Sequence, residues 1–343
     1  MRRSIPHWSH SRRQGGFTLM ELLIAMIISL LGLSAVGSMM MNFSKKRTSI
    51  TQTLSAQDNG VMALYRLERD VAQAGYGLMN LQSCATILNG TSASFTHYPV
   101  QITWGGAGVS DSIAVKWANP TTGAPGTELD NSSGTSMTGS QYNVRSNVGF
   151  SAGDVVVSTL ACAATTVGAI TNTTTIPYSY SGTALASSSQ TGFLAYFGQA
   201  GQFINRQYAI GPTAMTVADY PAFTTNNLVD NIVYLKAQYG VAGAITGNPA
   251  TVARWVSGAT TLNGTGCSGS SIHPACVVAI RIGVVARSAA VSSEPVDQPN
   301  PLPLLPVVFG SDSETFALPA GSSNLRYRAY STVIPLNNVI WGR

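Results

Sequence analysis

Residues 15–31 read GGFTLMELLIAMIISLL, a pair of glycines followed by an almost unbroken apolar run with one carboxylate, Glu21, near its start. No residue from Leu22 to Ser44 carries a charge. As a helix, this uncharged run is ~34 Å long, because each residue adds about 1.5 Å. A bilayer core is about 30 Å thick. The run therefore predicts a transmembrane helix from Leu22 to Ser44.

Glu21 lies just inside one end of this helix. A carboxylate at the centre of a membrane helix costs about 2.5–3.5 kcal/mol on insertion scales. A residue with a cost of this kind usually has a function, so Glu21 is a candidate functional residue.

The stretch from Arg12 to Ala25 resembles the class III signal of type IV prepilins and pseudopilins. That signal has a short basic leader ending in Gly, a Phe that becomes the mature N-terminus, and a Glu at the fifth mature position. Gly16, Phe17 and Glu21 match it residue by residue. The resemblance implies that a prepilin peptidase cuts between Gly16 and Phe17 on the cytoplasmic side and methylates the new amine.

The resemblance also implies that Glu21 pairs with the N-terminal amine of a neighbouring subunit during filament assembly. Two opposite charges in apolar surroundings are tolerable when paired and costly alone. Such a pair would set the axial register of the subunits.

Residues 1–16 hold four Arg, two His and no acid, as a targeting segment does. An ordinary secretory signal would instead be cut after the small residues 35–37. The apolar run is longer than the core of about 7–15 residues found in such signals. Lys45, Lys46 and Arg47 flank the far end of the run, so the topology is assigned from the cleavage motif rather than from charge.

The composition indicates an exported protein rich in β-structure. Of its 343 residues, 45% are hydrophobic and only 10% charged, against the usual quarter or so. The net charge is +5, from 19 basic and 14 acidic residues, but four arginines lie in the leader, which leaves 15 against 14, or +1. No basic patch with interleaved aromatic residues occurs, so we expect no nucleic-acid partner.

All four cysteines, Cys84, Cys162, Cys267 and Cys276, follow the membrane segment, as expected in an oxidising compartment. Four cysteines allow three pairings. The local pair Cys267–Cys276 closes a small Ser/Gly-rich loop and is favoured, and Cys84–Cys162 follows by elimination. A zinc site at Cys267, His273 and Cys276 is the alternative, but it lacks a fourth ligand and metal-like spacing.

The helix is expected to continue beyond the membrane. No proline occurs between Pro6 and Pro99, and apolar residues recur at helical steps along 50–71. A helix from Phe17 to about Ala74 would be ~87 Å long and would end at Gly75 or Gly77, where glycine adopts a left-handed cap. We expect the 50–71 stripe to pack on the chain's own globular domain.

From about residue 78 the pattern changes to short β-type runs, which predicts an α+β fold with a β-rich pilin-like body. The domain boundaries expected are a leader at 1–16, a membrane half of the helix at 17–44, an amphipathic half at 45–76 and the body at 77–343. The candidate strands are Phe95–Trp104, Ser112–Trp117, Asp154–Leu160, Phe193–Phe197, Gln202–Ile210, Leu235–Val241, Cys276–Ala286, Thr315–Leu318 and Leu325–Pro335.

The stretches between these strands differ in composition. Residues 119–140, 163–192 and 243–272 are rich in Ser, Thr, Gly and Asn and are either solvated loops or surface hairpins. Residues 294–312 hold five prolines, which cannot donate to a sheet, and this segment is expected to be a stiff extended loop.

Residues 66–76, 228–235 and 326–338 resemble the PilW family of minor pilins, and the type II secretion pseudopilin GspJ is similar. Residues 228–235 have spacing that suits one or two helical turns before a strand. The family implies a low-abundance subunit that primes or caps the pilus together with other minor pilins, the major pilin and a tip adhesin. It implies a single-pass inner-membrane protein with a periplasmic body that later reaches the pilus and the cell surface.

Catalytic and cofactor motifs were not found, and no enzyme and no cofactor are expected. After the leader only His97 and His273 remain, with no nucleophile elbow, phosphate-binding loop or zinc-protease motif. Four residues, Arg66, Glu68, Arg69 and Asp70, could form a polar site, but at i,i+4 steps they are expected to be salt-bridged helix surface.

Rival functions follow from the same residues. One is a type II secretion pseudopilin, and another is a membrane-anchored adhesin that binds glycans through its Ser/Thr-rich loops. Trp104, Trp117 and Trp255 could stack a sugar, although core packing is the more frequent role of such residues. A hydrolase that uses His97 is the third rival.

Overall fold

A computed structural model describes residues 16–81, 83–84, 86–90, 92–119, 126–199, 203–219, 224–245, 251–292, 295–306 and 314–341. The leader up to Gly15 lies outside the described residues. The chain divides into two compact units, Met1–Thr51 and Gln52–Arg343. Each unit is described by itself.

Helix α1 (Leu19–Gln73) belongs to both units, and its predicted course is confirmed. It has 55 residues and no internal proline. It ends where Gly75 (φ 83°) and Gly77 (φ 74°) take the left-handed conformation that side-chain-bearing residues avoid.

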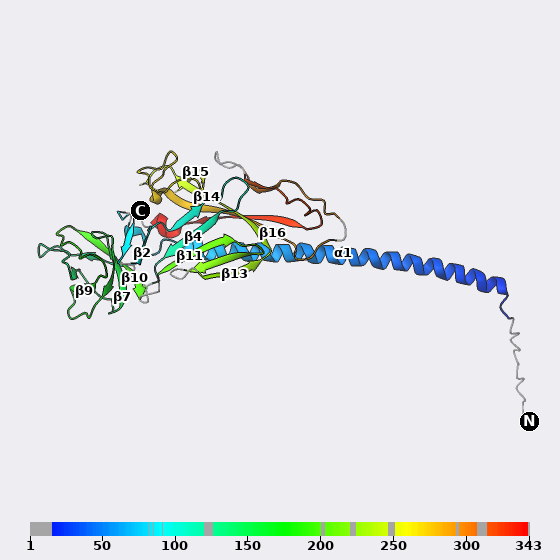
Figure 1. Ribbon diagram of the computed structural model, residues 1–343, viewed down its shortest axis with the longest axis horizontal. Helices are drawn as coiled ribbons and strands as arrows, with labels where there is room; N and C mark the ends of the chain where they lie inside the picture. The colour runs from blue at the N-terminus through cyan, green and yellow to red at the C-terminus, as the bar shows by residue number, and fades with distance from the viewer. Residues whose placement is uncertain are drawn as a thin grey trace, which may run out of the picture. The chain divides into compact units, whose positions relative to one another are not determined.

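The rest of the chain is mostly antiparallel β-structure (Figure 1). Short helical segments are η1 (Met79–Leu81), η2 (Pro274–Cys276) and α2 (Asn337–Trp341). The strands are β1 (Ile87–Asn89), β2 (Ser92–Phe95), β3 (Val100–Thr103), β4 (Ser112–Trp117), β5 (Gly126–Leu129), β6 (Gln141–Asn143), β7 (Asp154–Ser158), β8 (Ala164–Val167), β9 (Thr175–Ser179), β10 (Gly192–Gln199), β11 (Ile204–Ile210), β12 (Ala214–Asp219), β13 (Thr224–Asp230), β14 (Ile232–Ala242), β15 (Val252–Ser257), β16 (Val277–Arg287), β17 (Leu302–Leu305), β18 (Glu314–Phe316) and β19 (Tyr327–Pro335).

The second half of α1 packs against two sheets. One has the strand order β13-β12-β11-β4-β3 and the other β15-β14-β16-β19. The apolar residues of α1 from Ala56 to Val71 share one core cluster with buried side chains of both sheets. This half of the helix therefore packs on its own body, but the predicted 50–71 stripe is confirmed only in part. Leu64, Leu67 and Val71 lie in or against the core, whereas Ile50, Leu54 and Val61 are exposed.

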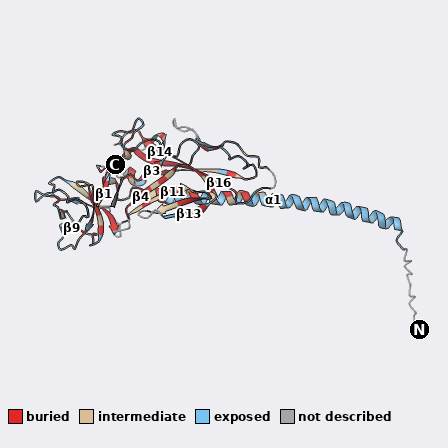
Figure 2. Cartoon of the chain, in the orientation of Figure 1, coloured by how far each residue is buried: buried red, intermediate tan, exposed pale blue. Residues whose placement is uncertain are grey.

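A six-stranded sheet, β5-β10-β7-β8-β9-β6, is an insertion in this arrangement. It is formed by residues 126–199, which lie between β4 and β11, and those two strands are hydrogen-bonded neighbours in the five-stranded sheet. The insertion has its own core, built around Tyr142, Val156, Ile176 and Tyr196. Residues coloured red as buried lie along the strands of the sheets in Figure 2.

The helical turns predicted at 228–235 are wrong. Residues 228–230 end β13 in one sheet, and residues 232–235 begin β14 in the next. Asn231 separates them with φ 60°, which interrupts any continuous helix. The run is too short for its apolar spacing to distinguish a helix from two strand ends.

The expectation for the proline-rich segment is wrong in part. Leu302–Leu305 forms β17 and pairs with β18, although Pro303 lies within it. A two-stranded pair leaves the outer backbone groups unpaired, and proline is tolerated on such an edge.

The Ser/Thr-rich stretches resolve partly into strands. Strands β5, β8, β9 and β15 lie within them. The hairpin alternative holds for β8 with β9 and for β15 with β14, whereas β5 pairs with the distant β10. Among the predicted strands, Ser112–Trp117 has the observed bounds, whereas Phe95–Trp104 is a strand only at its first residue and over Val100–Thr103.

Candidate functional site

The segment around Gly16, Phe17 and Glu21 opens the described part of the chain. Residues 16–18 precede the helix, and the Phe17 side chain is 86% exposed. The peptide bond between Gly16 and Phe17 thus lies in non-helical backbone just before α1, a conformation that a protease can bind in extended form.

Thr18 and Glu21 form a capping box at the start of α1. The Thr18 amide and the Thr18 hydroxyl both donate to Glu21 Oε2, at 3.1 Å each, and the Glu21 amide donates to Thr18 Oγ1 at 3.3 Å. This reciprocal pattern satisfies amides that a helix N-terminus leaves unpaired. It also places a negative charge at the positive end of the helix dipole. Glu21 therefore has a structural role in the single subunit, and Oε1 stays outside the box.

The first unit presents apolar side chains without burying them. Every residue from Gly16 to Thr48 is exposed, as the pale blue first half of α1 in Figure 2 shows. By length and composition α1 is long and apolar enough to cross a membrane, with a mean hydropathy of 2.4 in its most apolar window. Exposed apolar surface of this extent requires lipid or other helices around it.

The second half of α1 has a buried and an exposed face. Gln52, Ala56, Gly60, Ala63 and Leu67 are buried. A Cβ added at Gly60 would overlap the ring of Tyr330, so glycine allows the helix to approach β19 closely. Small residues at this spacing let α1 lie near the sheet.

Asp70 is part of this buried face, so the expectation that it belongs to a salt-bridged helix surface is wrong: its side chain is buried and its ion pair joins it to another element. It is 6% exposed and accepts hydrogen bonds from Arg206 Nη1, at 2.7 Å, and from the Tyr208 hydroxyl. Arg206 also bonds both carboxylate oxygens of Asp219, at 2.6 and 3.1 Å. Arg66 and Glu68 do lie on the exposed face.

These contacts shift the titration of the cluster. The hydrogen bond that Arg206 donates to Asp219, followed by the one that it donates to Asp70, raises the pKa of Arg206. Burial, helped by Asp70, raises the pKa of Tyr208. The cluster therefore keeps a charged guanidinium and a neutral phenol, and it joins the helix to β11 and β12.

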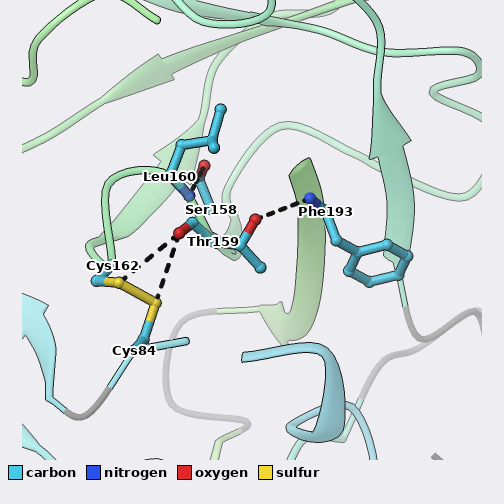
Figure 3. Close-up of a disulfide and its surroundings, with 6 residues drawn as sticks. All are labelled: Cys84, Ser158, Thr159, Leu160, Cys162 and Phe193. Atoms are coloured by element: carbon cyan, nitrogen blue, oxygen red, sulfur yellow. Dashed lines mark hydrogen bonds between the residues drawn. A yellow bond between two sulfur atoms is a disulfide. The ribbon is translucent and has the colours of Figure 1, made fainter. Parts of the chain in front are cut away.

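Both predicted disulfides are present. Cys84–Cys162 joins the segment after α1 to the turn between β7 and β8, across 78 residues of sequence, and Cys267–Cys276 closes a loop of 9. Figure 3 shows the first bond beside Thr159, whose hydroxyl accepts the amide of Phe193 at 2.9 Å. The disulfide thus ties the inserted sheet covalently to the segment that follows the long helix.

The zinc alternative is excluded because its two thiols form a disulfide. His273 instead caps η2, where its Nδ1 accepts the amide of Ala275. Within the described ranges no group of three or more His, Cys, Asp or Glu side chains could hold a metal ion. His97 is buried beside the Tyr98 ring.

Two buried lysines were missed by the sequence analysis. Lys236 donates to Asp111 Oδ1 at 2.9 Å, and both side chains are 1% exposed. Lys116 donates to the Thr96 hydroxyl at 2.7 Å, and burial lowers its pKa to about 8. For both residues, the only signal in the sequence is a lysine within an apolar strand. That signal does not indicate which residue the lysine would bond.

Two regions of the chain match models of known protein families. Residues 11–37 match the prokaryotic N-terminal methylation motif. Residues 204–338 match PilW, the type IV pilus-assembly protein W. The chain is thus similar to the PilW family of type IV pilus-assembly proteins over its last third and more, and to prepilins at its start. No curated protein and no solved structure matches it.

The PilW match covers the strands from β11 to β19 and ends in α2. The six-stranded inserted sheet lies outside it. The methylation motif covers the capping box and the exposed apolar part of α1 up to Gly37. The motif implies processing by a prepilin peptidase, and pilus assembly implies other pilins as partners.

Proposed function

We propose that the chain is a minor pilin of the PilW family that is cut between Gly16 and Phe17 and methylated on the Phe17 amine. The observation that carries the proposal is the sequence of features at this point: a methylation motif, exposed non-helical backbone, then an apolar helix with one carboxylate. Before assembly, residues 22–44 would anchor the protein in the inner membrane with its body in the periplasm. The leader would remain on the cytoplasmic side.

Glu21 would then pair with the methylated amine of a neighbouring subunit. The capping box uses Oε2, which leaves Oε1 for that amine. A charge in apolar surroundings is strongly disfavoured when its counter-charge is missing. Only the axial position that brings both charges together would therefore be stable.

The outer face of α1 offers a second contact surface within the second unit. Leu54, Val61 and Tyr65 are 52%, 53% and 59% exposed, respectively. Their spacing of seven and four places them on one side of a helix. This stripe would continue the packing between subunits beyond the membrane segment.

The proposed position is the priming or tip complex, with other minor pilins, the major pilin and a tip adhesin. The inserted sheet enlarges the body with a second core. A subunit at the end of a fibre has fewer neighbouring subunits than one in the shaft, so a large body fits there without steric conflict. A subunit present in few copies there would support twitching motility and adhesion.

Substitution of the residue before the cut tests the processing. Gly16→Glu should leave a full-length precursor, because a bulky charge would replace the small residue at the scissile bond. Ser4→Glu adds the same charge elsewhere in the leader and should be processed normally. Immunoblots of cells with an active prepilin peptidase would show the difference in length, and a normally shortened Gly16→Glu protein would refute the assignment.

A further inference from the structure

A pocket of about 320 Å³ lies between the start of β3 and the loop after β15. Tyr98, Gln101 and Ile102 form one wall, Tyr239 of β14 contributes to the floor, and residues 258–263 form the other wall. Its volume is at the lower end of the about 300–1,000 Å³ found for small-molecule sites. The lining residues Ala259 and Asn263 are exposed, so the pocket opens to solvent.

The loop wall is held in place by several bonds. The Cys267–Cys276 disulfide closes the segment that follows this wall in the sequence. The Thr261 amide donates to Ser270 O at 3.1 Å, and the Ile272 amide donates to Thr261 O at 2.9 Å. A Cβ at Gly258 would overlap the Ile102 side chain, so the two walls are in close contact at the base. The pocket is therefore pre-formed, which lowers the entropy cost of binding.

Polar groups of the pocket have bonding capacity left for a ligand. Tyr239 accepts the Ile102 amide with its hydroxyl oxygen and still has a proton to donate. The bonds that Gln101 accepts, from Thr96 and Lys116, both end on Oε1, which leaves Nε2 to donate. Asn263 Oδ1 accepts from Ser271 at 2.7 Å, which likewise leaves its Nδ2.

The chemistry of the lining is aromatic and neutral. Tyr98 is half-buried, and burial raises its pKa, so it is an uncharged phenol with an apolar ring face. None of the described residues that line the pocket is Asp, Glu, Lys, Arg or His. An anion would find no cation in the lining, since the neighbouring Lys116 is not a lining residue and donates to Thr96 and Gln101. An apolar ligand would leave the amide and hydroxyl donors unpaired, which is costly.

We propose that this pocket binds one ring of a neutral glycan. A pyranose has an apolar face of C–H groups, which fits an aromatic ring, and a rim of hydroxyls, which fits amides and phenols. This function is separate from assembly, because the pocket shares no residue with the Gly16–Glu21 segment or with the outer stripe of α1. A variant that loses glycan binding can therefore still be tested for assembly, and a variant that loses assembly can still be tested for glycan binding.

Saturation-transfer NMR on the full chain in polyoxyethylene detergent micelles tests the proposal without a sugar-based detergent. The probes are glucose, galactose, mannose, N-acetylglucosamine and N-acetylgalactosamine. At least one should receive saturation, and Ala259→Trp, which fills the pocket mouth, should abolish it. Ala289→Trp places the same side chain at an exposed site outside the pocket and should change nothing.

Tyr98→Phe and Gln101→Leu should each weaken binding of that sugar roughly 3- to 10-fold, the effect of one lost hydrogen bond. Tyr180→Phe, in the inserted sheet, is the matched control and should bind as the parent does. Saturation of none of the five sugars would overturn the proposal, as would equal saturation in Ala259→Trp. Tighter binding of glucuronate or glucose 6-phosphate than of every neutral sugar would also overturn it.

Discussion

At the scale of single residues, Glu21 has two roles, and only one of them depends on its negative charge. Its carboxylate closes the capping box with Thr18, and it is the proposed partner of a neighbouring amine. A glutamine can fill the third position of a capping box, but it carries no charge. The two roles therefore respond differently to substitution.

Glu21→Gln should keep the start of α1 and the cleavage but lose incorporation into pili, because the amine would lack a counter-charge. Thr18→Ala removes the cap at a cost of about 0.5–2 kcal/mol and keeps the charge, so it should still be incorporated. The amount of each variant protein in sheared pilus fractions measures its incorporation. Normal incorporation of Glu21→Gln would mean that charge does not set the register.

Arg206→Ala should destabilise the body by about 2–4 kcal/mol, since it leaves the buried Asp70 carboxylate without its cation. The Arg206 side chain is 29% exposed, which keeps the loss below that of a fully buried pair. Arg145→Ala breaks a pair whose side chains are 73% and 59% exposed and should cost under about 0.5 kcal/mol. Urea unfolding of the full chain in micelles compares them, and equal losses would contradict a structural role for the cluster.

Lys116 makes stability depend on pH. Its pKa is lowered by burial to about 8 in the folded chain, against about 10.4 when unfolded. Between these values the unfolded chain binds more protons, so stability should rise with pH, by at most about 3 kcal/mol. Unfolding midpoints at pH 7, 8 and 9 should rise, and this rise should be lost in Lys116→Met but kept in Lys46→Met. An equal rise in Lys116→Met would assign the effect to another group.

At the scale of elements, the two disulfides stabilise different parts of the body. Closing 78 residues removes more chain entropy from the unfolded state than closing 9. The Cys84→Ser/Cys162→Ser variant should therefore lose roughly 4–5 kcal/mol and the Cys267→Ser/Cys276→Ser variant roughly 2–3 kcal/mol. Urea midpoints under oxidising conditions give the order. The reverse order, or no loss in either variant, would contradict this account of how the body is held together.

The long helix and the cysteine pairs were predictable because their signals are local or few. A charge-free run, helical spacing and two glycines define α1, and four cysteines permit few pairings. The Asp70–Arg206 pair joins residues separated by 136 positions, and nothing in the local sequence links them. The ion pair of Lys236 with Asp111 is hidden for the same reason.

Errors in the predicted strands have local causes. At 228–235 the spacing of apolar residues fits two turns of helix as well as two strand ends, and Asn231 in a left-handed conformation decides between them. At β17 the prolines were given too much weight, because an edge position tolerates Pro303. In the candidate site, the motif predicted the processing residues, but the pocket at Tyr98 depends on strands far apart in sequence.

At the scale of the whole molecule, the chain joins a long apolar helix, proposed to serve in assembly, to a body with an inserted sheet. Deletion of the gene should reduce piliation and twitching and leave protein secretion unchanged, because the proposed role is in a pilus. A full-length copy should restore both, and a Gly16→Glu copy should not. Loss of secretion with normal twitching would favour the pseudopilin alternative instead.

The most direct measurement is mass spectrometry of the N-terminal peptide of the protein purified from its own cells. The account predicts a chain that begins at Phe17 with one methyl group on its amine. A protein that retains residues 1–16, or one trimmed near Gly37, would contradict it.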